Sequence, residues 1–205
     1  RPRAGNVHIF ELDPALKLTP KDLRRVDLAE WLKRRHAKHI RSYQRVHNDT
    51  VEDGSIYMMY RLGSNTEPTF TVPPGNGADR TSGPAIDIMR LGSDATAVAK
   101  EDFDLGSRIS GSGSGVDTIT VLNEANGTCS FRKIFDAGAL SGNTVREVGM
   151  FSDEALIARA VLGTAITRTA GSPQLLGIWT FGHNAVAASE MFGLYGQNWF
   201  WRRMT

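Results

Sequence analysis

Hydrophobic residues in the last third of the chain gather in short runs that turn residues separate. The runs cover 145–151, 156–162 and 175–181, with a polar break at 152–154 and a Gly-Ser-Pro turn at 171–173. Their length, their β-branched residues and the Gly, Pro and Ser between them predict strands of an antiparallel meander rather than helices. A further extended piece is expected at 164–169, after Gly163.

Apolar side chains occupy both alternating sets of positions in these runs, as Leu156 beside Ile157 and Ile178 beside Trp179 illustrate. A sheet with one face in water would alternate more cleanly between polar and apolar positions. We therefore expect this sheet to be covered on both faces, either by a second sheet or by another subunit.

A hairpin is predicted upstream of this block. Two strand-like runs, 116–122 and 128–135, flank Asn126 and Gly127, a pair typical of a type I′ turn. Cys129 falls inside the second run and is expected to be a small buried residue. Short strands are also predicted at 55–62 and 86–91.

The N-terminal third shows a different pattern. Residues 1–18 favour an extended arm, which would be either a strand at the sheet edge or a segment that binds a partner. Thr19 is a good N-cap, Pro20 suits the first helical position, and Asp22 stands three residues after the cap. Apolar residues then recur every three or four positions from 23 to 46, which predicts one amphipathic helix that ends near 47–48.

The polar face of this predicted helix is basic. Three interpretations are open: a solvated face, a surface that docks on an acidic protein, or a nucleic-acid contact, which no DNA-binding motif supports. His36 and His39 share the helix, but no third ligand stands at a suitable spacing for zinc. The candidate interface residues on this helix are Arg24, Arg25, Arg34, Lys38, Arg41 and Arg45.

The stretch 182–205 ends in a dense group of aromatic and arginine residues. Trp, Tyr and Arg dominate binding energies when an interface desolvates them. This tail either folds back over its own sheet or inserts into a neighbouring subunit. Its candidate interface residues are Phe192, Tyr195, Trp199, Phe200, Trp201, Arg202 and Arg203.

Charge is distributed unevenly along the 205 residues. The net charge is +2, yet nine Lys or Arg stand against three acids between residues 21 and 47, so the remainder is acidic. Surfaces of opposite sign on one chain suit head-to-tail contact between copies. The single cysteine excludes an intrachain disulfide. No run of 18 apolar residues occurs, so no membrane partner is expected.

No catalytic motif is present: the chain has neither a Gly-x-Ser-x-Gly elbow nor a His-Glu-x-x-His pair. The acidic clusters at 101–104 and 153–154 are expected to be solvated turn or helix-end residues. Glu147 is the one acid in an apolar run, and a cross-strand partner such as Arg159 or Arg168 would account for it. We therefore predict no catalytic residue, no metal and no cofactor.

Four short motifs carry a resemblance to a known class of proteins. They are Arg-Glu-Val-Gly-Met-Phe at 146–151, Leu-Ile-Ala-Arg-Ala-Val-Leu at 156–162, Ile-Thr-Arg-Thr at 166–169 and Trp-Thr-Phe at 179–181. In this order they resemble a segment of structural proteins of tailed bacteriophages, including tail-fibre, collar and accessory virion proteins. The resemblance spans about a fifth of the chain and contains no catalytic residue.

The sequence thus predicts a mainly β protein with an antiparallel β-sandwich-like domain at 85–181. An N-terminal arm and basic helix would occupy 1–62, a Gly- and Pro-rich linker 63–84, and an aromatic docking tail 182–205. The resemblance implies a non-enzymatic virion component of the tail, neck or collar, including a fibre-anchoring role, assembled in the host cytoplasm. Its partners would be copies of itself and other virion proteins. The alternatives are a capsid decoration protein and a carbohydrate-binding receptor module that uses Trp199 and Trp201.

Overall fold

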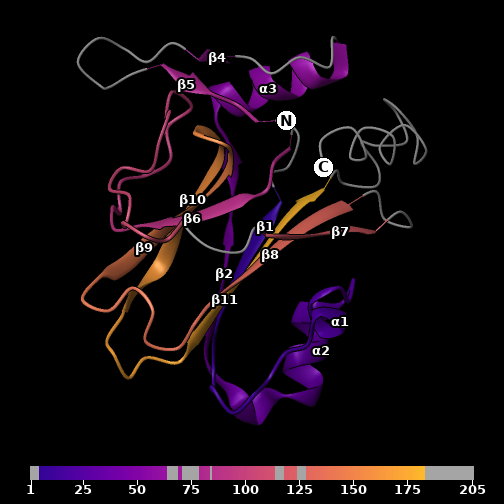
Figure 1. Cartoon of the computed structure of the whole chain (residues 1–205), viewed down its shortest axis with the longest axis vertical. Coiled ribbons are helices and arrows are strands. Elements are labelled where there is room, and N and C mark those ends of the chain that lie inside the picture. Colours follow the sequence, from indigo (N-terminus) through magenta and orange to yellow (C-terminus); the bar gives the residue numbers. More distant parts are fainter. Residues whose placement is uncertain are drawn as a thin grey trace.

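Two antiparallel sheets form the body of the protein in the computed structural model (Figure 1). The structure describes residues 5–63, 69–70, 79–83, 85–113, 118–123 and 128–182. Within these residues the chain is mainly β, as the sequence predicts. The predicted tail interface residues, the Asn126-Gly127 turn and most of the predicted linker lie outside the described residues.

The helices and strands follow the chain in a fixed order. They are β1 (Asn6–Leu12), α1 (Pro20–Leu23), α2 (Leu28–Arg35), the 3-10 turn η1 (Ala37–His39), β2 (Ile40–His47), β3 (Asp49–Thr50), α3 (Glu52–Gly63), β4 (Thr69–Phe70), β5 (Arg80–Thr81), β6 (Ile88–Gly92), β7 (Ile119–Asn123), β8 (Thr128–Phe135), β9 (Thr144–Ser152), β10 (Ala155–Thr167) and β11 (Gln174–Gly182).

The first sheet has the strand order β2-β1-β11-β8-β7. β7 and β8 pair as the sequence predicts for the hairpin, and Cys129 is buried. β1 lies between β2 and β11, so the prediction of an N-terminal arm or edge strand is wrong for residues 6–12. Val7 and Ile9 face one core while Phe10 and Leu12 face another, and an interior strand alone buries both sets.

The second sheet has the order β3-β10-β9-β6. β9 and β10 form the predicted hairpin, but β11 belongs to the first sheet. The predicted meander of residues 145–181 is therefore wrong for its last strand. β10 also continues through Gly163 as one strand of 13 residues. Its far end reaches β2, where the Gln44 amide accepts from Thr164 N at 3.2 Å and donates to Thr164 O at 3.0 Å.

One hydrophobic core fills the space between the two sheets. Val7, Phe131 and Trp179 enter it from the first sheet, while Met89 and Val148 enter it from the second. Each sheet brings buried side chains to this core from alternating positions. The two sheets are therefore packed on each other through their inner faces.

The outer face of each sheet is covered as well. α1 and α2 lie over the first sheet, where Leu28 and Leu32 pack with Phe10, Leu176 and Ile178 (Figure 1). The segment 93–113 lies over the second sheet, where Leu105 packs with Phe151 and Leu156. The expectation of coverage on both faces is confirmed, and elements of the same chain provide the cover.

The predicted basic helix is wrong beyond residue 35. The capping box at Thr19 is formed, since its hydroxyl accepts from Asp22 N at 3.2 Å and Asp22 accepts from Thr19 N at 2.9 Å. The chain then forms two short helices and a 3-10 turn before it extends into β2. Residues 40–47 bond to β1 along their whole length, and this pairing outweighs the helical spacing of their apolar residues.

The predicted strand at 55–62 is also wrong, because these residues belong to α3. Gly54 lies so close to β10 that a Cβ there would meet Ile157 O at 2.0 Å. Tyr57 is buried in the main core, whereas Tyr60 is 49% exposed. α3 thus closes one end of the two-sheet body against β10 (Figure 1).

Candidate interaction surface

A basic surface covers the outside of the helical layer on the first sheet. α2 turns Leu28 and Leu32 toward the sheet, which leaves its charged side in solvent. Arg41 and Arg45, predicted on a helix, instead lie on β2, next to the same layer. The predicted residues of the basic surface lie on α2, η1 and β2 or in the turn between α1 and α2, and each is exposed: Arg24, Arg25, Arg34, Lys38, Arg41 and Arg45.

Some of these cations are neutralised locally. Asp27 pairs with Arg25 at 3.2 Å and with Arg34 at 3.3 Å, and Asp13 pairs with Arg41 at 2.6 Å. Arg24 and Lys38 form no ion pair with any residue in the described part of the chain. The surface therefore keeps an excess of positive charge after its internal pairs are formed.

Aromatic rings lie among these cations. The Arg25 guanidinium stands 5.0 Å from the Trp31 ring centre, and Lys33 Nζ stands 4.5 Å from that of Tyr43. His8 Nδ1 is 2.8 Å from the Tyr43 hydroxyl oxygen. Burial, with Arg45 and Lys33 nearby, lowers the pKa of His8 to about 4, so this imidazole is neutral at physiological pH.

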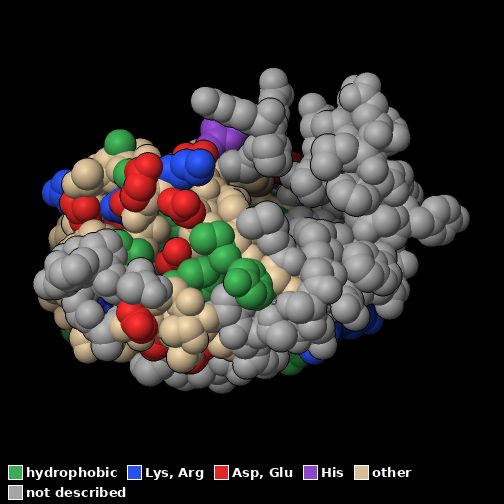
Figure 2. Space-filling model, turned by 90° about the horizontal axis from the view of Figure 1, so that it is seen from above, with side chains coloured by type: hydrophobic (Ala, Val, Ile, Leu, Met, Phe, Trp, Pro, Cys, Tyr) green, Lys and Arg blue, Asp and Glu red, His purple; other side chains and the backbone are tan. Residues whose placement is uncertain are grey.

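The opposite end of the molecule, where α3 lies, has a different character. Seen from that end, acidic side chains stand close to a group of hydrophobic ones (Figure 2). Exposed acids on β3, at the start of α3 and in the neighbouring segment include Asp49, Glu52 and Glu101. The backbone bond from Glu52 N to Lys100 O, 2.8 Å long, holds the last two segments together.

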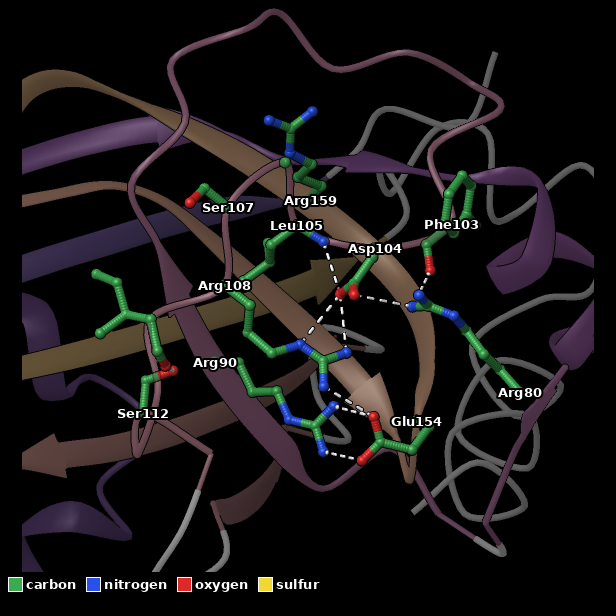
Figure 3. Close-up of polar contacts among 12 residues, drawn as sticks. Arg80, Arg90, Phe103, Asp104, Leu105, Ser107, Arg108, Ser112, Glu154 and Arg159 are labelled. Carbon is green, nitrogen blue, oxygen red and sulfur yellow. Dashed lines mark hydrogen bonds and ion pairs between the residues drawn. The ribbon is translucent and has the colours of Figure 1, made fainter. Parts of the chain in front are cut away.

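An ion-pair chain runs along the outer side of the second sheet (Figure 3). Glu154 accepts from Arg90 at 2.7 and 3.1 Å and from Arg108 at 2.8 Å. Asp104 accepts from Arg108 at 2.8 Å and pairs with Arg80 at 3.1 Å. Burial opposes ionisation of Glu154, but these hydrogen bonds outweigh it, and its pKa lies below the ordinary value.

A second network surrounds Arg159, which is 2% exposed. Its Nε donates to Glu147 at 2.6 Å, and its two terminal nitrogens donate to Asp102 at 2.7 Å and Asp94 at 3.3 Å. The expected partnership of Glu147 with Arg159 is confirmed. Glu147, fully buried, also accepts backbone N–H groups of 94, 106 and 107.

These networks correct the interpretation of the acidic clusters. Asp102, Asp104 and Glu154 were expected to be solvated, yet each pairs with an arginine that comes from another part of the chain. Arg108 stands four residues after Asp104, which is the one local signal for any of these pairs. The networks fasten the covering segment 93–113 to β9 and β10, and their carboxylates have cationic partners rather than an open substrate site.

His36 and His39 lie with ring centres 6.3 Å apart, and no group of three or more potential ligands gathers around a common point in the described part of the chain. None of the described helices is both long and apolar enough to cross a bilayer.

Comparisons with known proteins identify no relative of this chain. No family model, no curated protein and no solved structure matches this chain.

Proposed function

We propose that this protein is a non-enzymatic structural component of a tailed-phage virion, located in the tail, neck or collar. The observation that supports this most is the position of the resembling motifs in the fold. They coincide with β9, β10 and β11, so one segment supplies the central hairpin of one sheet and a central strand of the other. The motifs that carry the resemblance therefore form the central strands that a β-sandwich-like body would need.

Three of the buried charged residues of this body come from the same motifs. Glu147 belongs to the first motif, Arg159 to the second and Arg168 to the third, and each is at most 2% exposed. Buried charged groups need partners in fixed positions, so a chain that retains these motifs retains the contacts between them. This supports a shared scaffold with the phage proteins.

Contacts between copies would use the two ends of the molecule. The basic surface around α2 and the acidic end near α3 are complementary in charge, and such patches align subunits head to tail. The described part of the chain exposes few large hydrophobic side chains, namely Val26, Tyr43 and Tyr60. We therefore assign the contact between copies to charge and to these few hydrophobic side chains. The aromatic tail, which the sequence predicts to be a docking segment, would add to it.

The decisive experiment is to locate the protein on a particle. Phage particles with an affinity tag on this chain would be labelled with gold and imaged by electron microscopy. We expect label at the tail, neck or collar in a fixed copy number. Label spread over the head would favour capsid decoration, and particles that lack the protein altogether would refute a structural role.

A further inference from the structure

Among the described residues, three arginine side chains are almost completely buried, and two of them have hydrogen-bond acceptors for every nitrogen. Arg159 has three carboxylates and the carbonyl of Thr96. Arg168 donates to the carbonyls of Ala139, Pro173 and Asp136 at 2.8 to 3.2 Å, one from each nitrogen. Each nitrogen of these two guanidinium groups therefore has a hydrogen-bond acceptor within the protein.

Arg132 is different. It sits in the middle of β8 between Ile119 and Ile178, 2% exposed, and donates one hydrogen bond, from Nη1 to Leu23 O at 2.8 Å. Its Nε is buried without any acceptor. No carboxylate in the described part of the chain lies within ion-pair distance of it. A buried cation without a partner costs folding free energy. We therefore expect its open donors to bind an anion from outside the chain.

Two cavities open beside this side chain. The smaller, about 150 Å³, lies under α2 and is lined by Arg132 with Asp27 and Glu30. The larger, about 540 Å³, lies between the segment before α1 and β8, and is lined by Arg132 with Lys17, Lys133 and Asp136. The smaller cavity holds two acids against one cation, since the nearby His8 is neutral. The larger holds three cations against one acid, so an anion is favoured there.

The walls of the larger cavity are mostly apolar. They are formed by Leu18, Leu23, Ile119, Ile134, Phe135 and Leu140. Its volume lies within the usual range of small-molecule sites, which combine apolar walls with a few polar anchors. Lys133 donates to Met89 O and Ser112 O, and Lys17 is exposed to solvent, so Arg132 is the buried cation of this cavity with a donor left open.

We propose that this cavity binds a small organic carboxylate, with its two oxygens on the Arg132 guanidinium and its apolar part against Leu18, Ile119 and Phe135. A planar guanidinium matches the two oxygens of a carboxylate, and the apolar walls select against a fully hydrated inorganic ion. Burial lowers the pKa of Arg132 to about 10, which still leaves the group charged at neutral pH.

The test uses the full chain, labelled with ¹⁵N in its arginine side chains, and follows the Arg132 Nε–H resonance. Benzoate is the probe, benzyl alcohol supplies the ring without the charge, and acetate supplies the charge without the ring. We expect benzoate to shift this resonance saturably and to bind at least about tenfold more tightly than either control. Inorganic phosphate is the fourth arm and is expected to bind weakly.

Two variants complete the experiment. Arg132→Met should weaken benzoate binding about tenfold or more, whereas Arg146→Met, which removes an exposed cation on β9 away from the cavity, should leave it unchanged. Arg132→Met should keep or raise the wild-type unfolding midpoint, because it removes a buried cation without a partner. Arg168→Met should lower the midpoint, because all three nitrogens of Arg168 donate to backbone carbonyls.

Four results would overturn the proposal. They are a wild-type Nε–H resonance that benzoate does not move, equal affinity for benzyl alcohol, equal affinity for phosphate, and unchanged benzoate binding by Arg132→Met. Three of these four are read on the wild-type protein, so the proposal stays testable even if Arg132→Met does not fold.

Discussion

Buried charge at single residues joins the second sheet to the segment that covers it. Glu147 faces Arg159 diagonally across β9 and β10, and backbone N–H groups of the covering segment complete its hydrogen bonds. Ion pairs of this kind are weak evidence for net stability, yet removing one partner is severe because the other charge stays buried. The pair therefore fixes where the segment 93–113 sits.

Replacing Glu147 by Gln tests this at the scale of one residue. The change keeps the size of the side chain but leaves Arg159 without its closest carboxylate. Because Arg159 keeps Asp102 and Asp94, we expect a loss of about 1.5–3 kcal/mol in the free energy of unfolding, measured by urea denaturation.

Arg146→Gln is the matched control, since Arg146 is exposed on the same strand and should change stability by less than about 0.5 kcal/mol. If Glu147→Gln and Arg146→Gln lower the free energy of unfolding equally, the Glu147–Arg159 pair has no special role in stability.

At the scale of elements, close backbone approach decides how α3 meets the second sheet. Gly54 stands against the backbone of Ile157 in β10, and Tyr57 enters the main core one turn further along. No residue larger than glycine fits that contact without moving the helix. The position of α3 is therefore set by one glycine and one aromatic ring.

Gly54→Ala should destabilise the protein, although alanine is the better helix former. The new Cβ would lie 2.0 Å from Ile157 O, so α3 must shift away from β10. Overpacking of this kind costs about 1–3 kcal/mol, which exceeds the helix-propensity gain of about 1 kcal/mol. Thermal unfolding would measure the difference.

Gly163→Ala on β10 serves for comparison, because no atom lies within 4 Å of the Cβ position there. It should leave the unfolding midpoint near that of the wild type. A Gly54→Ala protein as stable as this control would show that α3 is not tightly seated.

At the scale of the whole molecule, the proposed contact between copies depends on the separation of charge between its ends. The basic surface lies over the first sheet, and the acidic end lies beyond the second sheet near α3. Because most of these groups are exposed, the attraction between copies would be screened by salt within a Debye length of about 10 Å at 0.1 M. Association through them is therefore expected to depend on ionic strength.

Reversing charge on the basic surface tests the head-to-tail contact. The double variant Arg24→Glu with Lys38→Glu should lose self-association at low salt while its circular dichroism spectrum stays unchanged. Light scattering coupled to size-exclusion chromatography, at low and at high salt, would measure the mass.

Arg146→Glu, a reversal at an exposed site on β9, should assemble as the wild type does. A wild-type protein that stays monomeric at every salt concentration would contradict the contact.

The sequence by itself determined the elements whose signals are local. The β7–β8 and β9–β10 strand pairs and the Thr19 capping box follow from residues near each other in the chain. For Glu147 the sequence left two partners open, Arg159 and Arg168, and the structure decided for Arg159. Tertiary structure alone decided that 40–47 is a strand, because β1 offers it a full set of backbone bonds, and that β11 joins β1 rather than β10. It also decided which arginines find acceptors. Those outcomes depend on contacts between distant segments, whose partners no local pattern of residues can specify.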